Sequence, residues 1–149
     1  MKKIRLISNI ISISLLVGYT IFLIIVWRKI PNVLPTHFEA AGEADSYGKK
    51  ITLILMPILG YMILFAIIFF ERFPNIWNFP VEVTDRNRNR LYMLSFQMMA
   101  VVKIMMVVLF IYIGFLTIYY PMPIWPMCLI FGIMFGAIIL SIVRMIRAK

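Results

Sequence analysis

Charged side chains are scarce in this sequence, and cysteine and histidine occur once each. Only 14% of the 149 residues are charged, whereas 63% are hydrophobic. A soluble domain has about 25% charged and about 45–50% apolar residues, so this composition excludes an ordinary soluble globule as well as a disordered chain. The single cysteine, Cys128, excludes a disulfide framework or a cysteine-rich metal cluster within one chain.

What the sequence does have is four long apolar runs, of which the third contains one charged residue, Lys103. A helix needs roughly 20 apolar residues to cross about 30 Å of hydrocarbon, and in lipid it satisfies its own backbone hydrogen bonds. The first run is too long for a cleaved signal peptide, so we expect a retained anchor. We predict an all-α, polytopic membrane protein, a single four-transmembrane-helix bundle over residues 1–149, with spans at 6–27, 51–70, 92–120 and 124–143.

Lysine and arginine are distributed unequally between the two ends of these spans. If the N-terminus is cytoplasmic, ten basic residues lie on the inner side and four on the outer side. The positive-inside rule then predicts a cell-membrane protein with both termini in the cytoplasm, an outer loop at 28–50 and a cytoplasmic loop at 71–90. The net charge of +9 thus reflects topology, and the expected partner is the lipid bilayer rather than nucleic acid.

The outer loop contains the only histidine and half of the six acidic residues. Thr36 and Glu39 have the spacing of a helix capping box, but Gly42 would allow barely one turn of helix. The alternative is a hairpin in which a strand at Thr36–Phe38 turns at Gly42 and returns through Asp45–Tyr47. We favour the hairpin.

Three interpretations of the polar residues in this loop remain open. His37, Glu39, Glu43 and Asp45 contain the donor atoms of a metal site, but structural zinc usually has four ligands rich in Cys and His. The polar residues and glycines also suit a fixed turn geometry, in which His37 makes a hydrogen bond. A shaped loop with a titratable histidine suits recognition of a peptide or headgroup as well. We predict no metal and no cofactor.

Lys103 is the charged residue within the spans. It lies 16 residues before Tyr119, or about 24 Å along a helix, which leaves about 6 Å to the inner face of the hydrocarbon. We therefore interpret it as an inner-boundary anchor whose side chain reaches the interface. In the alternative, it faces the bundle and meets a backbone carbonyl or a polar side chain such as Gln97, because no acidic residue is expected at that depth. Since the spans lack Asp, Glu and His, we do not expect an enzyme.

Two motifs carry a resemblance to a known family. The outer loop contains Leu34 followed by Pro35, Thr36, His37, Phe38, Gly42, Asp45, Gly48 and Lys50, and the cytoplasmic loop contains Asn78, Pro80, Thr84 and Asn87. This pattern resembles a bacterial membrane family of unknown function whose domain opens the SdpI-type immunity proteins. The resemblance implies that the outer residues bind a ligand such as a peptide toxin.

Two hypotheses for function follow. The first, which rests on the resemblance, is a non-enzymatic immunity-type protein whose outer loop binds an extracytoplasmic peptide. The second is a small transporter or an accessory subunit of one. The second is weakened by the lack of acidic residues within the spans and of a convincing inverted repeat.

Overall fold

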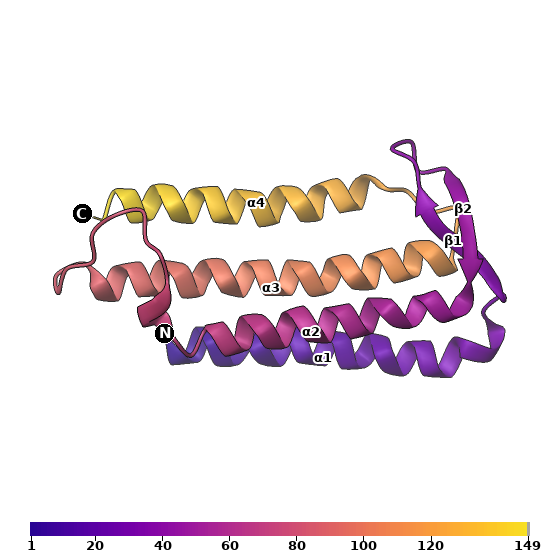
Figure 1. Ribbon diagram of the computed structural model, residues 1–149, viewed down its shortest axis with the longest axis horizontal. Coiled ribbons are helices and arrows are strands. Elements are labelled where there is room, and N and C mark those ends of the chain that lie inside the picture. Colours follow the sequence, from indigo (N-terminus) through magenta and orange to yellow (C-terminus); the bar gives the residue numbers. More distant parts are fainter. Residues whose placement is uncertain (149) are drawn as a thin grey trace.

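The computed structural model describes residues 1–148 as four long helices and one two-stranded sheet (Figure 1). The helices are α1 (Lys2–Val26), α2 (Leu55–Phe70), α3 (Arg88–Ile118) and α4 (Trp125–Ile146). The strands β1 (Val33–Phe38) and β2 (Ala44–Lys49) form an antiparallel hairpin. Short 3-10 turns occupy Trp27–Lys29, Lys50–Ile54 and Pro74–Ile76. With their adjoining turns, all four helices are long and apolar enough to cross a membrane, as predicted.

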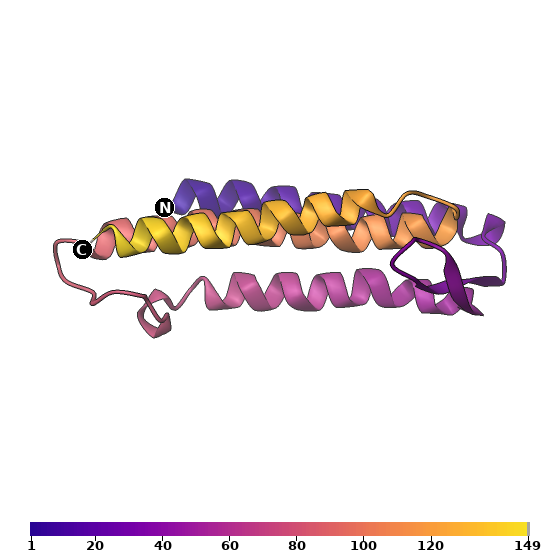
Figure 2. The same cartoon turned by 90° about the horizontal axis from the view of Figure 1, so that it is seen from above.

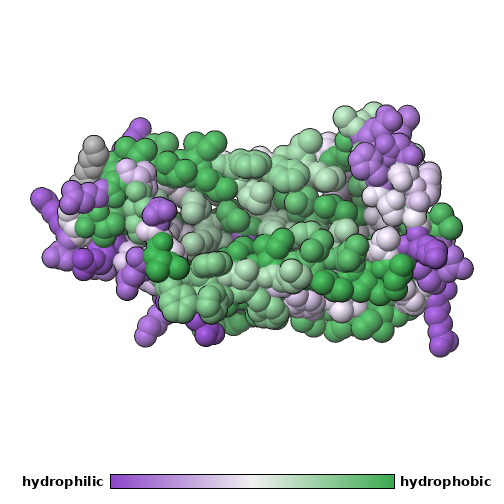
Figure 3. All heavy atoms as spheres, in the orientation of Figure 1, coloured by the Kyte–Doolittle hydropathy of each residue, from purple (hydrophilic) through white to green (hydrophobic). Residues whose placement is uncertain are grey.

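The helices lie roughly parallel, and the loops between them gather at two ends. Both termini and the loop between α2 and α3 lie at one end, which we call the terminal end, and the hairpin lies at the other, the hairpin end (Figure 1). Apolar residues cover the middle of the molecule, whereas hydrophilic residues gather at the two ends (Figure 3). This distribution is that of a multi-pass membrane protein.

Proline marks the beginnings of two helices. Pro126 is in the first turn of α4, and Pro57 is the third residue of α2, just after the 3-10 turn that precedes that helix. At Pro126 this removes no hydrogen bond, because the first backbone N–H groups of a helix have no intrahelical partner.

Helix α3 is the centre of the packing. It contacts each of the other three helices, and α1 and α2 also contact each other. Helix α4 packs mainly on α3 and is the most exposed of the four. Figure 2 shows it lying over α3, with α1 on one side and α2 on the other. Three helices therefore form the centre of the predicted four-helix bundle, and α4 packs on its outside. Lipid makes this possible because apolar surface left exposed to hydrocarbon carries no hydrophobic penalty.

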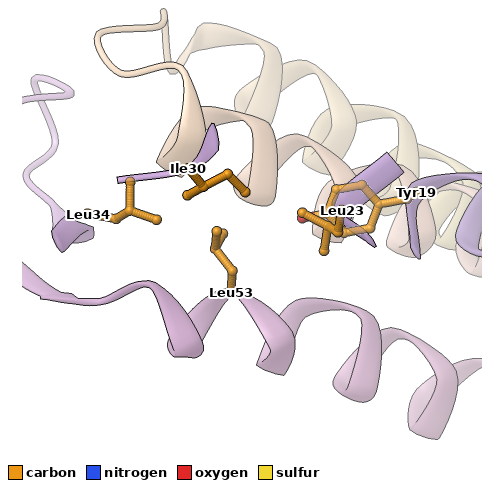
Figure 4. Packing of buried hydrophobic residues seen from close by; sticks show 5 residues of the cluster. All are labelled: Tyr19, Leu23, Ile30, Leu34 and Leu53. Atoms are coloured by element: carbon orange, nitrogen blue, oxygen red, sulfur yellow. The ribbon is translucent and has the colours of Figure 1, made fainter. Parts of the chain in front are cut away.

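The hairpin is attached to the helices by a buried apolar cluster. Leu34 of β1 packs with Tyr19 and Leu23 of α1, with Ile30, and with Leu53 of the 3-10 turn before α2 (Figure 4). A second cluster in the middle of the bundle joins three helices through Leu16, Leu64, Met106 and Val107. The first cluster thus joins the hairpin to α1 and to the turn before α2, while the second joins α1, α2 and α3.

Gly114 allows a close approach of α1 and α3, and its substitution tests this packing. A Cβ at Gly114 would overlap the Tyr19 hydroxyl and lie 2.6 Å from its Cζ. We expect Gly114→Ala to lower the free energy of unfolding by about 1–3 kcal/mol through overpacking, measured by SDS-induced unfolding in mixed micelles. The control is Gly132→Ala on α4, where a Cβ would meet nothing within 4 Å. Equal effects of the two substitutions would show that α1 and α3 are not packed in this way.

Candidate functional site

The segment between α1 and α2 folds as the hairpin that the sequence favoured. Gly42 has φ 89°, a conformation that glycine adopts readily. Its N–H donates to the Glu39 carbonyl at 2.8 Å, and the Glu39 N–H donates to the Glu43 carbonyl at 2.8 Å. Thr36 does not begin a helix because β1 pairs with β2 over these residues. Leu34 and Pro35 are buried, whereas the rest of the hairpin is largely exposed.

His37 and Asp45 form a hydrogen-bonded pair across the two strands. The His37 Nδ1 lies 2.6 Å from the Asp45 Oδ1, with the two side chains 69% and 37% exposed. Because a carboxylate accepts hydrogen bonds, Nδ1 donates, and no hydrogen bond to Nε2 occurs within residues 1–148, so Nε2 can meet a ligand. An exposed pair of this kind contributes only about 0–1 kcal/mol to stability, so its main consequence is to orient the imidazole.

The other residues of the motif between α1 and α2 shape the hairpin and its base. The pairing is irregular on both sides of His37. Gly48 pairs with Leu34, and a Cβ there would come within 2.8 Å of the Thr36 methyl group. At the base of the hairpin, the Lys50 ammonium lies 5.3 Å from the centre of the Trp27 ring.

The turn between α3 and α4 supports the far end of the hairpin. The Ala44 N–H donates to the Tyr120 hydroxyl at 3.2 Å, and the Phe38 and Tyr120 rings lie 5.8 Å apart. Ile124 packs beneath Gly42, where an added Cβ would lie 3.0 Å from its side chain. The hairpin is therefore held at both ends and lies across the helix termini.

Two hollows open beside β1. The larger, of about 460 Å³, lies between the hairpin and helices α3 and α4, and we call it the hairpin groove. Its walls are mainly apolar, with His37 and Glu39 at the polar edge; Phe38, Ile113, Leu116, Met127 and Phe131 are among its lining residues. The smaller, of about 270 Å³, lies between β1, the start of α2 and α3. An apolar hollow with a few polar groups is the usual form of a ligand site.

Lys103 is completely buried among three helices, and this corrects the expected inner-boundary anchor. Its Nζ donates to the Glu71 Oε1 at 2.7 Å and to the Asn9 side-chain oxygen. Glu71 is also completely buried. The expectation that no acidic residue would be available was wrong, because the long lysine side chain reaches the end of α2, where Glu71 directly follows the apolar run. The alternative agrees with the structure in part, because Lys103 faces the bundle and meets a polar side chain, which is Asn9 rather than Gln97.

Arg5 extends this buried polar cluster toward the terminal end. The Arg5 Nε lies 3.7 Å from the Glu71 Oε2, and the guanidinium lies 5.1 Å from the centre of the Phe96 ring. In the sequence, Arg5, Ser8, Asn9 and Ser12 repeat at the spacing of one helix face, and both serines are buried. That polar stripe was the signal from which a buried polar face on α1 could have been predicted.

The motif of the terminal-end loop forms the approach to α3. The Thr84 N–H donates to the Asn87 Oδ1 at 2.9 Å, and the Asn87 N–H donates to the Thr84 Oγ1 at 3.3 Å. These reciprocal bonds cap the chain just before Arg88. Pro80, Thr84 and Asn87 line one hollow of about 460 Å³, while Asn78 is exposed outside it.

The predicted site residues thus belong to three places rather than one. Pro35, Thr36, His37, Phe38, Gly42, Asp45, Gly48 and Lys50 lie on or next to the hairpin, Lys103 lies in the buried cluster, and the remaining four belong to the terminal-end loop. Within residues 1–148, the structure brings no three His, Cys, Asp or Glu side chains together in a group able to hold a metal ion.

Two comparisons with known proteins found a match, and the bounds of the first include the hairpin. Residues 15–61 match a family described as a domain of unknown function (DUF1648). An uncharacterized protein of Archaeoglobus fulgidus is 37% identical over 49 residues, which cover 33% of this chain and 25% of that protein. The chain therefore matches about a quarter of the length of this relative. No solved structure matches the chain.

Together, the fold and these comparisons define a multi-pass membrane protein that carries a region similar to this domain of unknown function. The matched residues contain the whole hairpin and the halves of α1 and α2 beside it. They do not include Arg5, Glu71 or Lys103 of the buried cluster.

Substitutions in the Lys103–Glu71 pair test the buried cluster. Glu71→Gln leaves the Lys103 charge buried without a carboxylate partner, so it should cost about 3–5 kcal/mol of unfolding free energy. Lys103→Met should cost less, because the Arg5 Nε still lies 3.7 Å from the Glu71 Oε2. The double variant should cost much less than the sum, as measured by SDS-induced unfolding in mixed micelles. The control is Lys49→Met, which removes an exposed cation. Strictly additive effects would mean that the pair is not formed.

Proposed function

We propose that this chain is a non-enzymatic protein of the bacterial cell membrane that binds an extracytoplasmic peptide at its hairpin, in the manner of an immunity protein. The observation that carries this proposal is the hairpin groove, which combines an apolar wall with the oriented imidazole of His37. The hairpin is supported on two sides, so the groove is shaped before a ligand arrives. Such preorganisation lowers the entropic cost of binding.

Two hydroxyl groups of α1 bond to their own helix backbone. The Ser8 Oγ donates to the Arg5 carbonyl at 3.1 Å, and the Thr20 Oγ1 donates to the Leu16 carbonyl at 2.8 Å. Hydroxyl groups bonded to their own helix backbone act as packing groups. The His37–Asp45 pair, in turn, is exposed at the surface of the hairpin. We therefore assign binding, and no reaction, to this pair.

A transporter is the second candidate, and the buried Lys103–Glu71 pair is the observation that favours it. Ionisable side chains inside a membrane bundle commonly mark ion or proton pathways. Here, however, the two groups pair with each other, and Asn9 takes a further hydrogen bond from Lys103. Solute flux in proteoliposomes is the measurement that separates this candidate from ligand binding.

The proposal requires the hairpin to face the outside, and cysteine labelling tests this orientation. In a Cys128→Ser background, a membrane-impermeant maleimide should label Ser46→Cys on intact cells. The same reagent should label Glu82→Cys only after permeabilisation, because positive-inside bias keeps the terminal end in the cytoplasm. Both positions are exposed, so accessibility is matched. The reverse labelling pattern would place the hairpin in the cytoplasm and contradict the proposed binding of an extracytoplasmic peptide.

Survival of cells that make their own peptide toxin tests the function. Deleting the gene should sensitise these cells to the peptide, and the wild-type chain should restore survival. His37→Ala and Asp45→Ala should fail to restore it, because they remove the oriented imidazole at the edge of the groove. Ser46→Ala, an exposed neighbour on the same hairpin, is the control. The exposed pair contributes little to stability, so immunoblots should show equal amounts of each variant. Unchanged survival after deletion, across the peptides tested, would refute the immunity function.

A further inference from the structure

Folding separates the charges of the outer segment into two groups. In the sequence, residues 28–50 contain four basic and three acidic residues and are nearly neutral. The hairpin places Arg28, Lys29, Lys49 and Lys50 at its base and Glu39, Glu43 and Asp45 at its tip, because the two strands run antiparallel. The tip is therefore acidic, a property that the nearly neutral composition does not reveal.

The acidic tip lies over α4 rather than over α1 and α2. Gly42 packs on Ile124, which directly precedes α4, and Ala44 bonds to Tyr120 in the turn between α3 and α4. Figure 1 shows the tip projecting beyond the start of α4, and in Figure 3 hydrophilic side chains gather at that corner, next to the apolar surface of the helices. The hairpin groove lies between this tip and helices α3 and α4.

Glu39 and Glu43 are exposed, and within residues 1–148 neither of them forms a salt bridge. Asp45 is paired only with His37. Glu39 thus lies at the edge of the apolar groove, and Glu43 lies across the hairpin turn from it, where its carbonyl accepts from the Glu39 N–H. Their attraction for a cation is stronger there than in bulk water, because the low-dielectric hydrocarbon is near. An anionic ligand would be repelled by the same two groups.

We infer that the hairpin groove takes the apolar face of a cationic amphipathic peptide, whose basic side chains pair with Glu39 and Glu43. This inference rests on the proposed function and names the chemistry of its ligand. The volume of about 460 Å³ suits a few apolar side chains, since ligand pockets are commonly about 300–1,000 Å³. The groove supplies apolar contact, and the acidic tip sets the sign of charge that is accepted.

The single cysteine provides a direct probe of the groove. Cys128 lines it and is exposed, so a bound peptide should shield its thiol from N-ethylmaleimide. The protein is placed in nanodiscs of zwitterionic phosphatidylcholine, which do not attract cations. Two synthetic amphipathic helices are compared, one of leucine and lysine and a twin of leucine and glutamate. The measured quantity is the rate of Cys128 alkylation at increasing peptide concentration.

We expect the lysine peptide to slow the alkylation and the glutamate twin to leave it unchanged. The double variant Glu39→Gln/Glu43→Gln should raise the half-protecting concentration of the lysine peptide about 5-fold, the effect of losing two exposed charge pairs. Glu82→Gln, an exposed acid at the terminal end, is the matched control and should not change it. Raising the salt concentration from about 0.1 M to about 1 M should weaken protection of the wild type and not of the double variant.

Two further controls separate peptide in the groove from other coverings. Ile25→Cys in a Cys128→Ser background places a thiol on the exposed face of α1, where Ile25 is 71% exposed. Protection at that position would mean that the peptide merely coats the disc, and it would overturn the inference. Protection of Cys128 by lysophosphatidylcholine alone would make the groove an acyl-chain site, with the same consequence.

The remaining outcomes distinguish the inference from the function on which it rests. Equal protection by the two peptides would overturn the preference for cations and leave peptide binding intact. Protection by neither peptide would contradict both peptide binding at the hairpin and the inference. Protection by the lysine peptide that is identical in the wild type and the double variant would overturn the role assigned to Glu39 and Glu43.

Discussion

The buried charge of Lys103 is the constraint on which the terminal half of the bundle depends. A lysine inside hydrocarbon must be paired, and its partners Glu71 and Asn9 come from the end of α2 and from α1. Pairing therefore requires three helices to meet at one point, close to the end of the apolar layer. Helix α4 supplies none of these groups and lies outside, against α3. The cost of burying charge thus defines a three-helix core and leaves the fourth helix exposed.

The hairpin end is held by apolar packing and a hydrogen bond to Tyr120 rather than by a buried ion pair. Leu34 attaches one end of the hairpin to the apolar cluster of α1 and α2, and Tyr120 supports the other end from the turn after α3. Because the hairpin crosses the helix termini, it creates a groove that none of the helices would form alone. A polar strand pair mounted on a rigid apolar bundle gives His37 and the acidic tip definite positions, which a ligand site requires.

Local chemistry explains why some features could be predicted. Gly42 and the prolines determine backbone conformations within a few residues, so the hairpin over Thr36–Phe38 and Asp45–Tyr47 was predictable. The partner of Lys103 was not, because Glu71 lies 32 residues away in the sequence. A flexible lysine side chain also reaches beyond the depth of its own backbone. Glu71 directly follows the apolar run, so the sequence assigns it to the loop, although its side chain is buried against Lys103.

The sequence by itself determined the four spans and the hairpin, since both follow from the composition and order of neighbouring residues. Only the tertiary structure decided which charged side chains pair with each other and which gather at one place on the surface. It buried Lys103 with Glu71 between helices, and it separated the nearly neutral segment between α1 and α2 into a basic base and an acidic tip. The physical reason is that electrostatic interactions depend on distance in space and on local dielectric, neither of which is contained in the order of residues along the chain.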